Sequence, residues 1–265
     1  MINSFTQTDL DSPTRLSLVN GQVVVYTHRA PNKNTVNEDC AALIPYSDDA
    51  GVLVIADGLG GQPSGETAST AAIKALSDTV SKAAKSNIPL RDAILDGIEK
   101  ANRQILNQSP GAATTLAVVE IQNNYIRPYH VGDSMIMLCG QRGKIKLQSV
   151  AHSPVGYAIE AGLLDEDEAI HHEERHLISN VVGSDEMSIE IGTTRKLSLR
   201  DTLIVASDGL FDNLYVTEII DIIRTGKLED AARTLIELTQ ERMEQKTDDL
   251  PCHPDDLTFI LFRRS

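Results

Sequence analysis

The chain of 265 residues lacks what a disulfide framework, a secretion signal or a membrane anchor would need. Its three cysteines, Cys40, Cys139 and Cys252, are odd in number and widely separated, without the C-x-x-C spacing of a zinc or redox site. No apolar run approaches the roughly 20 residues that span a bilayer, and the N-terminus has no basic start followed by an apolar stretch. These absences predict a cytoplasmic protein of a reducing compartment with no membrane partner.

Basic residues are scarce as well. Lys and Arg number 24 against 38 Asp and Glu, which gives a formal net charge of -14. This charge would repel phosphate backbones, so we expect no nucleic-acid partner. The chain is 41% hydrophobic, enough for a substantial core, and it has no fixed-period repeat and no linker-like stretch. We therefore expect one domain over residues 1–265, and a monomer.

Apolar patterning predicts strands and helices in separate blocks. Amphipathic helices are expected at 64–83, 90–106, 217–224 and 229–245. Strands are expected at 22–27, 40–45, 51–56, 187–197, 202–207 and 257–262, and four more at 115–121, 125–130, 134–139 and 144–149 suggest an antiparallel meander. Segregated blocks favour the α+β class, here an antiparallel β-sandwich flanked on each face by a pair of α-helices.

Acidic residues recur where the predicted strands begin or end. Like charges brought to neighbouring strand ends repel unless cations neutralise them. Oxygen ligands suit Mg²⁺ or Mn²⁺, and a glycine beside an aspartate lets a backbone carbonyl approach closely. A binuclear metal centre is therefore predicted from five segments: Glu38-Asp39, Asp57-Gly58, Gly132-Asp133-Ser134, Asp208-Gly209 and Asp255-Asp256.

Seven short blocks follow one another along the chain: NED (37–39), ADGLGG (56–61), ATTLAVV (113–119), HVGDS (130–134), AHS (151–153), ASDGLFD (206–212) and DDLTFIL (255–261). In this order they resemble those of the PP2C-type metal-dependent protein phosphatases found in bacteria. The resemblance covers nearly the whole chain, and it implies that family's fold, an antiparallel β-sandwich flanked by α-helices. The implied activity is hydrolysis of phosphoserine and phosphothreonine in proteins that a Ser/Thr kinase encoded elsewhere phosphorylates.

The same resemblance assigns roles to individual residues. Asp57 would bridge two Mn²⁺ or Mg²⁺ ions, with Glu38 and the Gly58 carbonyl completing one site. Asp208 and Asp255 would serve the other site. Asp39 would hold a metal-bound water, and a hydroxide bridging the two ions would attack phosphorus directly, without a phosphoenzyme. The resemblance also implies a third ion at Asp133 with Asp208, and a mobile flap at about 155–184.

One position departs from the family pattern. Relatives carry an arginine three residues before the NED block to grip the substrate phosphate, but this chain has Asn34 there. Lys33 and Arg29 are the nearby cations, and Lys33 is the expected substitute and a candidate catalytic residue. Lysine supplies a point charge without the bidentate fork of arginine, so phosphate affinity is expected to be weaker or differently oriented.

Two alternatives belong to other functional classes. His172-Glu173-Glu174-Arg175-His176 matches H-E-x-x-H, which on a helix would bind zinc as in a metalloprotease. The surrounding stretch has few apolar residues to bury such a helix. The second alternative is a phosphatase-like scaffold that binds without turnover. Lost metal ligands would indicate such a scaffold, whereas this chain retains Glu38, Asp57, Asp208 and Asp255.

Overall fold

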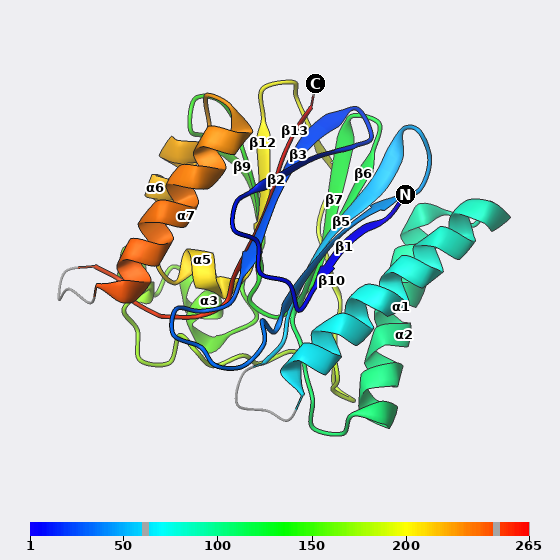
Figure 1. The fold of residues 1–265 in the computed structure, drawn as a ribbon, viewed down its shortest axis with the longest axis horizontal. Coiled ribbons are helices and arrows are strands. Elements are labelled where there is room, and N and C mark those ends of the chain that lie inside the picture. Colours follow the sequence, from blue (N-terminus) through cyan, green and yellow to red (C-terminus); the bar gives the residue numbers. More distant parts are fainter. Residues whose placement is uncertain (60–63, 246–249, 265) are drawn as a thin grey trace.

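Two antiparallel sheets pack face to face in the computed structural model, with helices on both outer faces (Figure 1). The structure describes residues 1–59, 64–245 and 250–264. Glycines 60 and 61 of the ADGLGG block lie outside these ranges. The predicted α+β sandwich flanked by helix pairs is confirmed.

The first sheet has the strand order β1-β4-β5-β6-β7-β10, and β11 also pairs with β7. Its central strands are continuous apolar runs because both of their faces are buried. In β4, Cys40 and Ala42 face the helices, whereas Ala41 and Leu43 face the other sheet. The strands are β1 (Asn3–Thr6), β4 (Asp39–Pro45), β5 (Ala50–Asp57), β6 (Leu116–Gln122), β7 (Tyr125–Val131), β10 (Glu190–Ile191) and β11 (Arg195–Lys196).

The second sheet has the strand order β2-β3-β13-β12-β8-β9. Its two central strands, β13 and β12, come from the C-terminal third of the chain and pair with each other. β13 also pairs with β3, and β12 also pairs with β8. The strands are β2 (Thr14–Leu18), β3 (Gly21–His28), β8 (Met135–Cys139), β9 (Ile145–Gln148), β12 (Thr202–Ala206) and β13 (Leu257–Arg264).

Helices cover the outer face of each sheet, so the core has three apolar layers: one between each helix pair and its sheet, and one between the two sheets. α1 (Gly65–Ser86) and α2 (Leu90–Gln108) pack on the first sheet, and α6 (Val216–Ile223) and α7 (Leu228–Glu244) pack on the second. The third apolar layer lies between the sheets. Among the described helices, none is long and apolar enough to cross a membrane.

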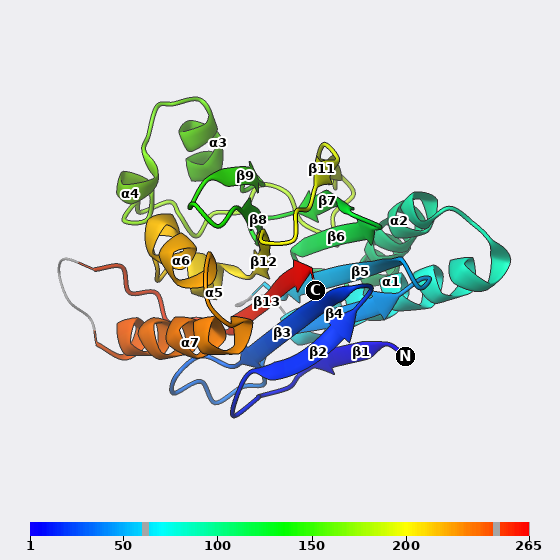
Figure 2. The ribbon, with the colours of Figure 1, turned by 90° about the horizontal axis from the view of Figure 1, so that it is seen from above.

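The first part of the segment between β9 and β10 projects from the sandwich (Figure 2), whereas Val182 near its end is buried in the core and pairs with Thr114. It carries two short helices, α3 (Pro154–Glu160) and α4 (Glu166–Ala169), which lie on the side of α6 (Figure 2). The N-cap of α3 is Ser153, whose hydroxyl accepts a hydrogen bond from the Gly156 N–H at 2.9 Å. This segment contains the predicted flap.

The structure corrects four details of the predicted elements. The four strands of the expected meander divide between the sheets, because β6 pairs with β7 and β8 pairs with β9 and β12. The expected strand at 187–197 is reduced to the short β10 and β11. The short strands β1 and β2 were not predicted, because each has few apolar residues. A short helix, α5 (Asp208–Phe211), also follows β12 directly.

Close packing at Gly209 positions the strand ends of the second sheet. A Cβ atom at Gly209 would collide with the backbone carbonyl of Asp256. We predict that Gly209→Ala lowers the free energy of unfolding by about 1 to 3 kcal/mol, the usual cost of overpacking. Gly140→Ala is the control, because the nearest atom there is the flexible end of Lys146, at 3.2 Å. Equal denaturant midpoints for the two variants would show that the close approach is unimportant.

Candidate metal centre

The predicted metal ligands meet at one end of the sandwich. Asp39 begins β4 and is the Cα partner of Asp57, which ends β5. In the second sheet, Asp208 follows β12 and Asp255 precedes β13, while the Ser207 N–H donates to the Thr258 carbonyl and joins the two strand ends. Antiparallel pairing therefore places the end of one strand beside the beginning of the next.

Asp133 reaches the same end by a different route. It lies in the link between β7 of the first sheet and β8 of the second, so the chain crosses from one sheet to the other at this residue. The division of the expected meander is therefore what brings the Gly132-Asp133-Ser134 turn to the other carboxylates. The Ser134 hydroxyl is hydrogen-bonded to Thr115 Oγ1 at 2.6 Å, which fixes the turn against β6.

Burial and mutual repulsion raise the pKa values of these carboxyl groups. The pKa of Asp57 is raised well above its usual value by burial and then by the negative charges of Asp39, Asp208, Asp255 and Asp133. Burial also raises the pKa of Asp133 to about 7 and that of Asp255 to about 6. Such a cluster is unfavourable when all its members are ionised, unless positive charge is placed among them.

Two buried carboxylate oxygens show that the cluster fits a cation. Within the described part of the chain, Asp39 Oδ1 and Asp133 Oδ1 have no hydrogen-bond partner. The other oxygen of Asp39 accepts a hydrogen bond from the Ser207 hydroxyl at 2.7 Å, so its side chain is held in place. A buried oxygen without a partner is costly, and carboxylate oxygens are the ligands that Mg²⁺ and Mn²⁺ prefer.

Glu38 and Gly58 lie together at the start of α1. The Gly58 N–H donates to the Glu38 carbonyl at 3.2 Å. A Cβ atom at Gly58 would collide with the Gly65 carbonyl, and one at Gly65 would lie 2.7 Å from Glu38 Oε1. These contacts require glycine at both positions and place the predicted ligands of the first ion on adjoining backbone segments.

Asp256 and Asp255 have different roles although they are adjacent. Asp256 Oδ1 accepts from the Ala30 N–H at 2.8 Å, and Oδ2 accepts from the Glu38 N–H and from Lys33 Nζ, both at 2.7 Å. Asp256 therefore ties the loop before β4 to the start of β13. This leaves Asp255 as the ligand candidate, and the structural role of Asp256 was not predicted.

The two cations proposed to replace the missing arginine are both paired with carboxylates. Lys33 Nζ lies 2.7 Å from Glu38 Oε2 and 2.7 Å from Asp256 Oδ2, and these charges raise the pKa of Lys33. Arg29 Nε donates to Asp9 Oδ2 at 2.7 Å, away from the cluster. Lys33 is therefore the cation that the structure brings to a predicted metal ligand.

Two residues that were not predicted to act in the site also lie there. Asp212 is the C-cap of α5, and Arg175 belongs to the flap segment. Arg175 Nε donates to Asp212 Oδ1, and its guanidinium also donates to the Phe211 carbonyl at 3.3 Å. Asp212 in turn contributes to the raised pKa of Asp133. The ASDGLFD block already contains Asp212, but its pairing with a residue 37 positions earlier depends on the fold.

The zinc-protease alternative is not supported by the structure. Residues 171–177 form turns rather than a helix, so the imidazoles of His172 and His176 do not share a helical face. His172 Nδ1 instead accepts a hydrogen bond from the Glu174 N–H at 3.2 Å. The H-E-x-x-H spacing has no catalytic meaning without the helix.

A second group of possible ligands lies beside the Asp133 turn. Nitrogen atoms of His130 and His152 and an oxygen of Glu190 are within 4.8 Å of one another. His152 Nδ1 accepts from the Gly132 N–H and from the Asn180 amide, so the ring proton is on Nε2, which donates to Glu190 Oε2 at 3.1 Å. Its nitrogens are thus already used, and His152 ties the turn to the flap and β10.

Comparisons with known proteins identify the family to which the chain belongs. The model of the family described as protein phosphatase 2C matches residues 27–249. Protein phosphatase PhpP of Streptococcus pneumoniae is 32% identical over 222 residues, which cover 77% of this chain and 85% of that protein. A solved S. agalactiae serine/threonine phosphatase superposes with a TM-score of 0.77 at 29% identity, over 92% of this chain and 100% of that one. The chain therefore belongs to the protein phosphatase 2C family.

A more distant structure adds information about the fold alone. The catalytic domain of the phosphatase PstP, solved in complex with 2 manganese ions, superposes with a TM-score of 0.69 at 23% identity, over 91% of this chain and 96% of that one. The family model and the relatives confirm the predicted family and enzyme class, a protein phosphatase, and the solved structures confirm the predicted fold class.

The raised pKa values of the carboxylate cluster predict how the stability of the metal-free protein depends on pH. A carboxyl group whose pKa is raised by folding binds more protons in the folded state than in the unfolded state, so its contribution to stability is lost as the pH rises. In excess chelator, the free energy of unfolding should therefore fall between pH 6.5 and pH 8, by up to about 1.4 kcal/mol per pH unit for each such group. Starting at pH 6.5 avoids the opposite effect of His130, whose pKa is lowered by burial.

Asp133→Asn provides the control for this measurement. The pKa of Asp133 lies at about 7, within the chosen range, and the substitution removes its titration while keeping its size. The variant should lose less stability than the parent between the two pH values in urea denaturation. A parent protein whose stability is constant or increases over this range would contradict the raised pKa values.

Proposed function

We propose that the protein hydrolyses phosphoserine and phosphothreonine in proteins with the help of bound Mn²⁺ or Mg²⁺. The observation that carries this proposal is the group of buried carboxylates from both sheets, Asp39, Asp57, Asp133, Asp208 and Asp255, whose pKa values are raised by burial and by neighbouring negative charges. Membership of the protein phosphatase 2C family supports it. The partners would be phosphoproteins made by a separate Ser/Thr kinase.

The proposed metal ligands are those that the family resemblance implies, and their position at neighbouring strand ends supports the assignment. Asp57 would lie between two ions, Glu38 and the Gly58 carbonyl would hold one, and Asp208 and Asp255 would hold the other. Bound divalent ions would supply a nucleophilic hydroxide at neutral pH and screen the negative charge of the phosphate.

Asp39 orients the attacking water in this proposal. Its Oδ2 is fixed by the Ser207 hydroxyl, and its buried Oδ1 is left to accept a hydrogen bond from the nucleophile. The oxygen of the water forms a bond to phosphorus as the bond to the serine or threonine oxygen breaks, and the proton that the water loses balances the proton that the leaving oxygen takes up. No covalent intermediate with the protein is required.

Asp133 is proposed to hold a third ion together with Asp208. Its unpartnered Oδ1 and the neighbouring charges of Asp212 and Asp255 support this assignment. The Arg175 guanidinium lowers the pKa of Asp133 and so partly offsets the repulsion.

Lys33 is proposed to contact the substrate phosphate in place of the family arginine. An ammonium group has three N–H donors, and Glu38 and Asp256 accept two of them. The third donor can reach a phosphate while the lysine stays between the two carboxylates. The same contacts hold Glu38, so Lys33 would act both as a positioning residue and as a phosphate ligand.

An assay with a small aryl phosphate and a phosphothreonine peptide tests the proposed function. Both substrates should be hydrolysed with Mn²⁺ or Mg²⁺, and neither in excess chelator. Asp57→Asn should abolish turnover, because it removes the charge shared by both ions, whereas Asp78→Asn, the same change at an exposed position of α1, is a control. Metal binding without hydrolysis would support the scaffold alternative, and turnover in chelator would contradict the metal mechanism.

Substitutions at positions 33 and 34 test the phosphate grip. Lys33→Ala should lower kcat/KM for the aryl phosphate by roughly 10-fold or more, as expected for the loss of a charged hydrogen bond. Asn34→Arg should raise kcat/KM, and the gain should shrink at high salt because exposed charges are screened. If neither change alters the kinetics, Lys33 has no role in binding phosphate.

A further inference from the structure

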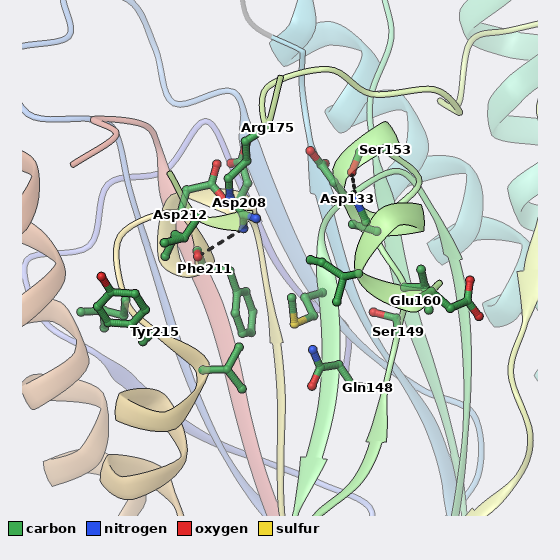
Figure 3. Close-up of a pocket in the computed structure, with 18 residues that line it drawn as sticks. Asp133, Gln148, Ser149, Ser153, Glu160, Arg175, Asp208, Phe211, Asp212 and Tyr215 are labelled. Atoms are coloured by element: carbon green, nitrogen blue, oxygen red, sulfur yellow. Dashed lines mark hydrogen bonds and ion pairs between the residues drawn. The ribbon is translucent and has the colours of Figure 1, made fainter. Parts of the chain in front are cut away.

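A pocket of about 210 Å³ opens beside the metal centre, between the flap segment and the α5–α6 region (Figure 3). Figure 3 shows Asp133, Asp208, Asp212 and Arg175 together at one end, with Phe211 between them and Gln148. Because Asp133 and Asp208 are proposed metal ligands, a phosphate bound at the ions would lie at this end of the pocket. The rest of the pocket would face the chain that carries the phosphate.

Most polar side chains in the walls already have partners. Arg175 and Asp212 form an ion pair. The Ser153 hydroxyl caps α3, the Ser149 hydroxyl accepts from the Ile136 N–H at 2.9 Å, and Tyr215 is bonded to His171. A polar ligand would therefore find few groups to bind beyond the metal centre.

Apart from Gln148 and Glu160, the remaining walls are apolar and come from three separate segments. Met135 lies at the start of β8, Ile159 and Ile170 belong to the flap segment, and Phe211 and Val216 belong to α5 and α6. Ile170 and Phe211 are buried, whereas Ile159 and Val216 are half-buried. These surfaces match an apolar group, because its transfer from water is favourable without any hydrogen bond.

The size of the pocket limits the occupant to a single large side chain. A cavity of about 150 Å³ lined by apolar residues holds a benzene molecule, and pockets for drug-sized ligands measure roughly 300 to 1,000 Å³. The volume here lies between these values. A Leu, Met or Phe side chain fits this range, and consecutive residues lie about 3.8 Å apart, so the side chain must belong to a residue near the phosphorylated one.

We propose that this pocket binds a bulky apolar side chain of the phosphoprotein substrate, a few residues from the phosphoserine or phosphothreonine. The inference rests on the proposed function and adds a sequence preference to it. The apolar side chain enters between α3 and α6 while the phosphate lies at the carboxylate end. Substrates without such a residue are bound by the phosphate alone.

A set of phosphothreonine peptides tests this preference. Each peptide has serine and glycine flanks with one phenylalanine, placed at one of the three positions before or after the phosphothreonine. At one position kcat/KM should rise by about 10-fold or more over the peptide without phenylalanine, the discrimination that an apolar pocket provides. Leucine or methionine there should retain most of the gain, whereas lysine, glutamate and serine should not.

The outcomes separate this inference from the proposed function. Equal rates for all the peptides would overturn the pocket assignment while leaving the phosphatase activity established. An equal gain with lysine or glutamate would also overturn it. If no peptide is hydrolysed with Mn²⁺, the proposed function fails and the inference fails with it.

Two wall substitutions and one control locate the effect in the protein. Ile159→Gln and Val216→Thr place uncharged polar groups on opposite walls, and each should reduce the preference for the phenylalanine peptide to about 3-fold or less. Leu163→Gln is the matched control, because Leu163 belongs to the same flap segment and is 81% exposed. It should retain the full preference. Unchanged preference in both wall variants, with native circular dichroism spectra, would overturn the proposal.

A cross-linking experiment provides a readout that does not depend on turnover. The phenylalanine of the best peptide is replaced by a leucine analogue with a photoreactive diazirine, and adducts are mapped by mass spectrometry. The adducts should lie on Met135, Ile159 or Val216, and excess unlabelled phenylalanine peptide should prevent them. Adducts confined to surfaces outside the pocket would contradict the inference.

Discussion

The repulsion among buried carboxylates is the constraint on which the rest of the site depends. Asp57 is surrounded by four other aspartates whose charges raise its pKa, and the described contacts leave one oxygen of Asp39 and one of Asp133 without a partner. A protein that needed only stability would not gather these groups, because burying like charges is costly. The arrangement becomes favourable when divalent cations are bound.

The fold brings these carboxylates together by antiparallel pairing within each sheet and by packing between the sheets. Asp39 and Asp57 are register partners in the first sheet, and Asp208 and Asp255 flank a strand pair in the second. Two hydrogen bonds help to link the sheets at this end, from the Glu38 N–H to Asp256 and from the Ser207 hydroxyl to Asp39, and the chain itself crosses from β7 to β8 at the Asp133 turn. The metal centre therefore depends on how the two sheets are placed.

The sequence predicted the features that depend on short segments. Strands such as β4 and β5 are continuous apolar runs, and Asp57 and Asp208 are each followed by glycine at a strand end, so both could be identified without the fold. The ion pairs of Lys33 with Asp256 and of Arg175 with Asp212 could not, because they join residues 223 and 37 positions apart. The division of the meander was also missed, because local pattern does not specify which sheet a strand joins.

Crystals grown with Mn²⁺ would show whether the buried carboxylates hold two ions, because anomalous scattering locates each ion. We expect two strong anomalous peaks roughly 3.5 to 4 Å apart, the usual separation in two-metal sites, with Asp57 between them. Glu38 and Gly58 should contact one peak, and Asp208 and Asp255 the other. An absence of peaks at these carboxylates, or a peak only at His130, His152 and Glu190, would show that the carboxylate cluster is not a binuclear metal centre.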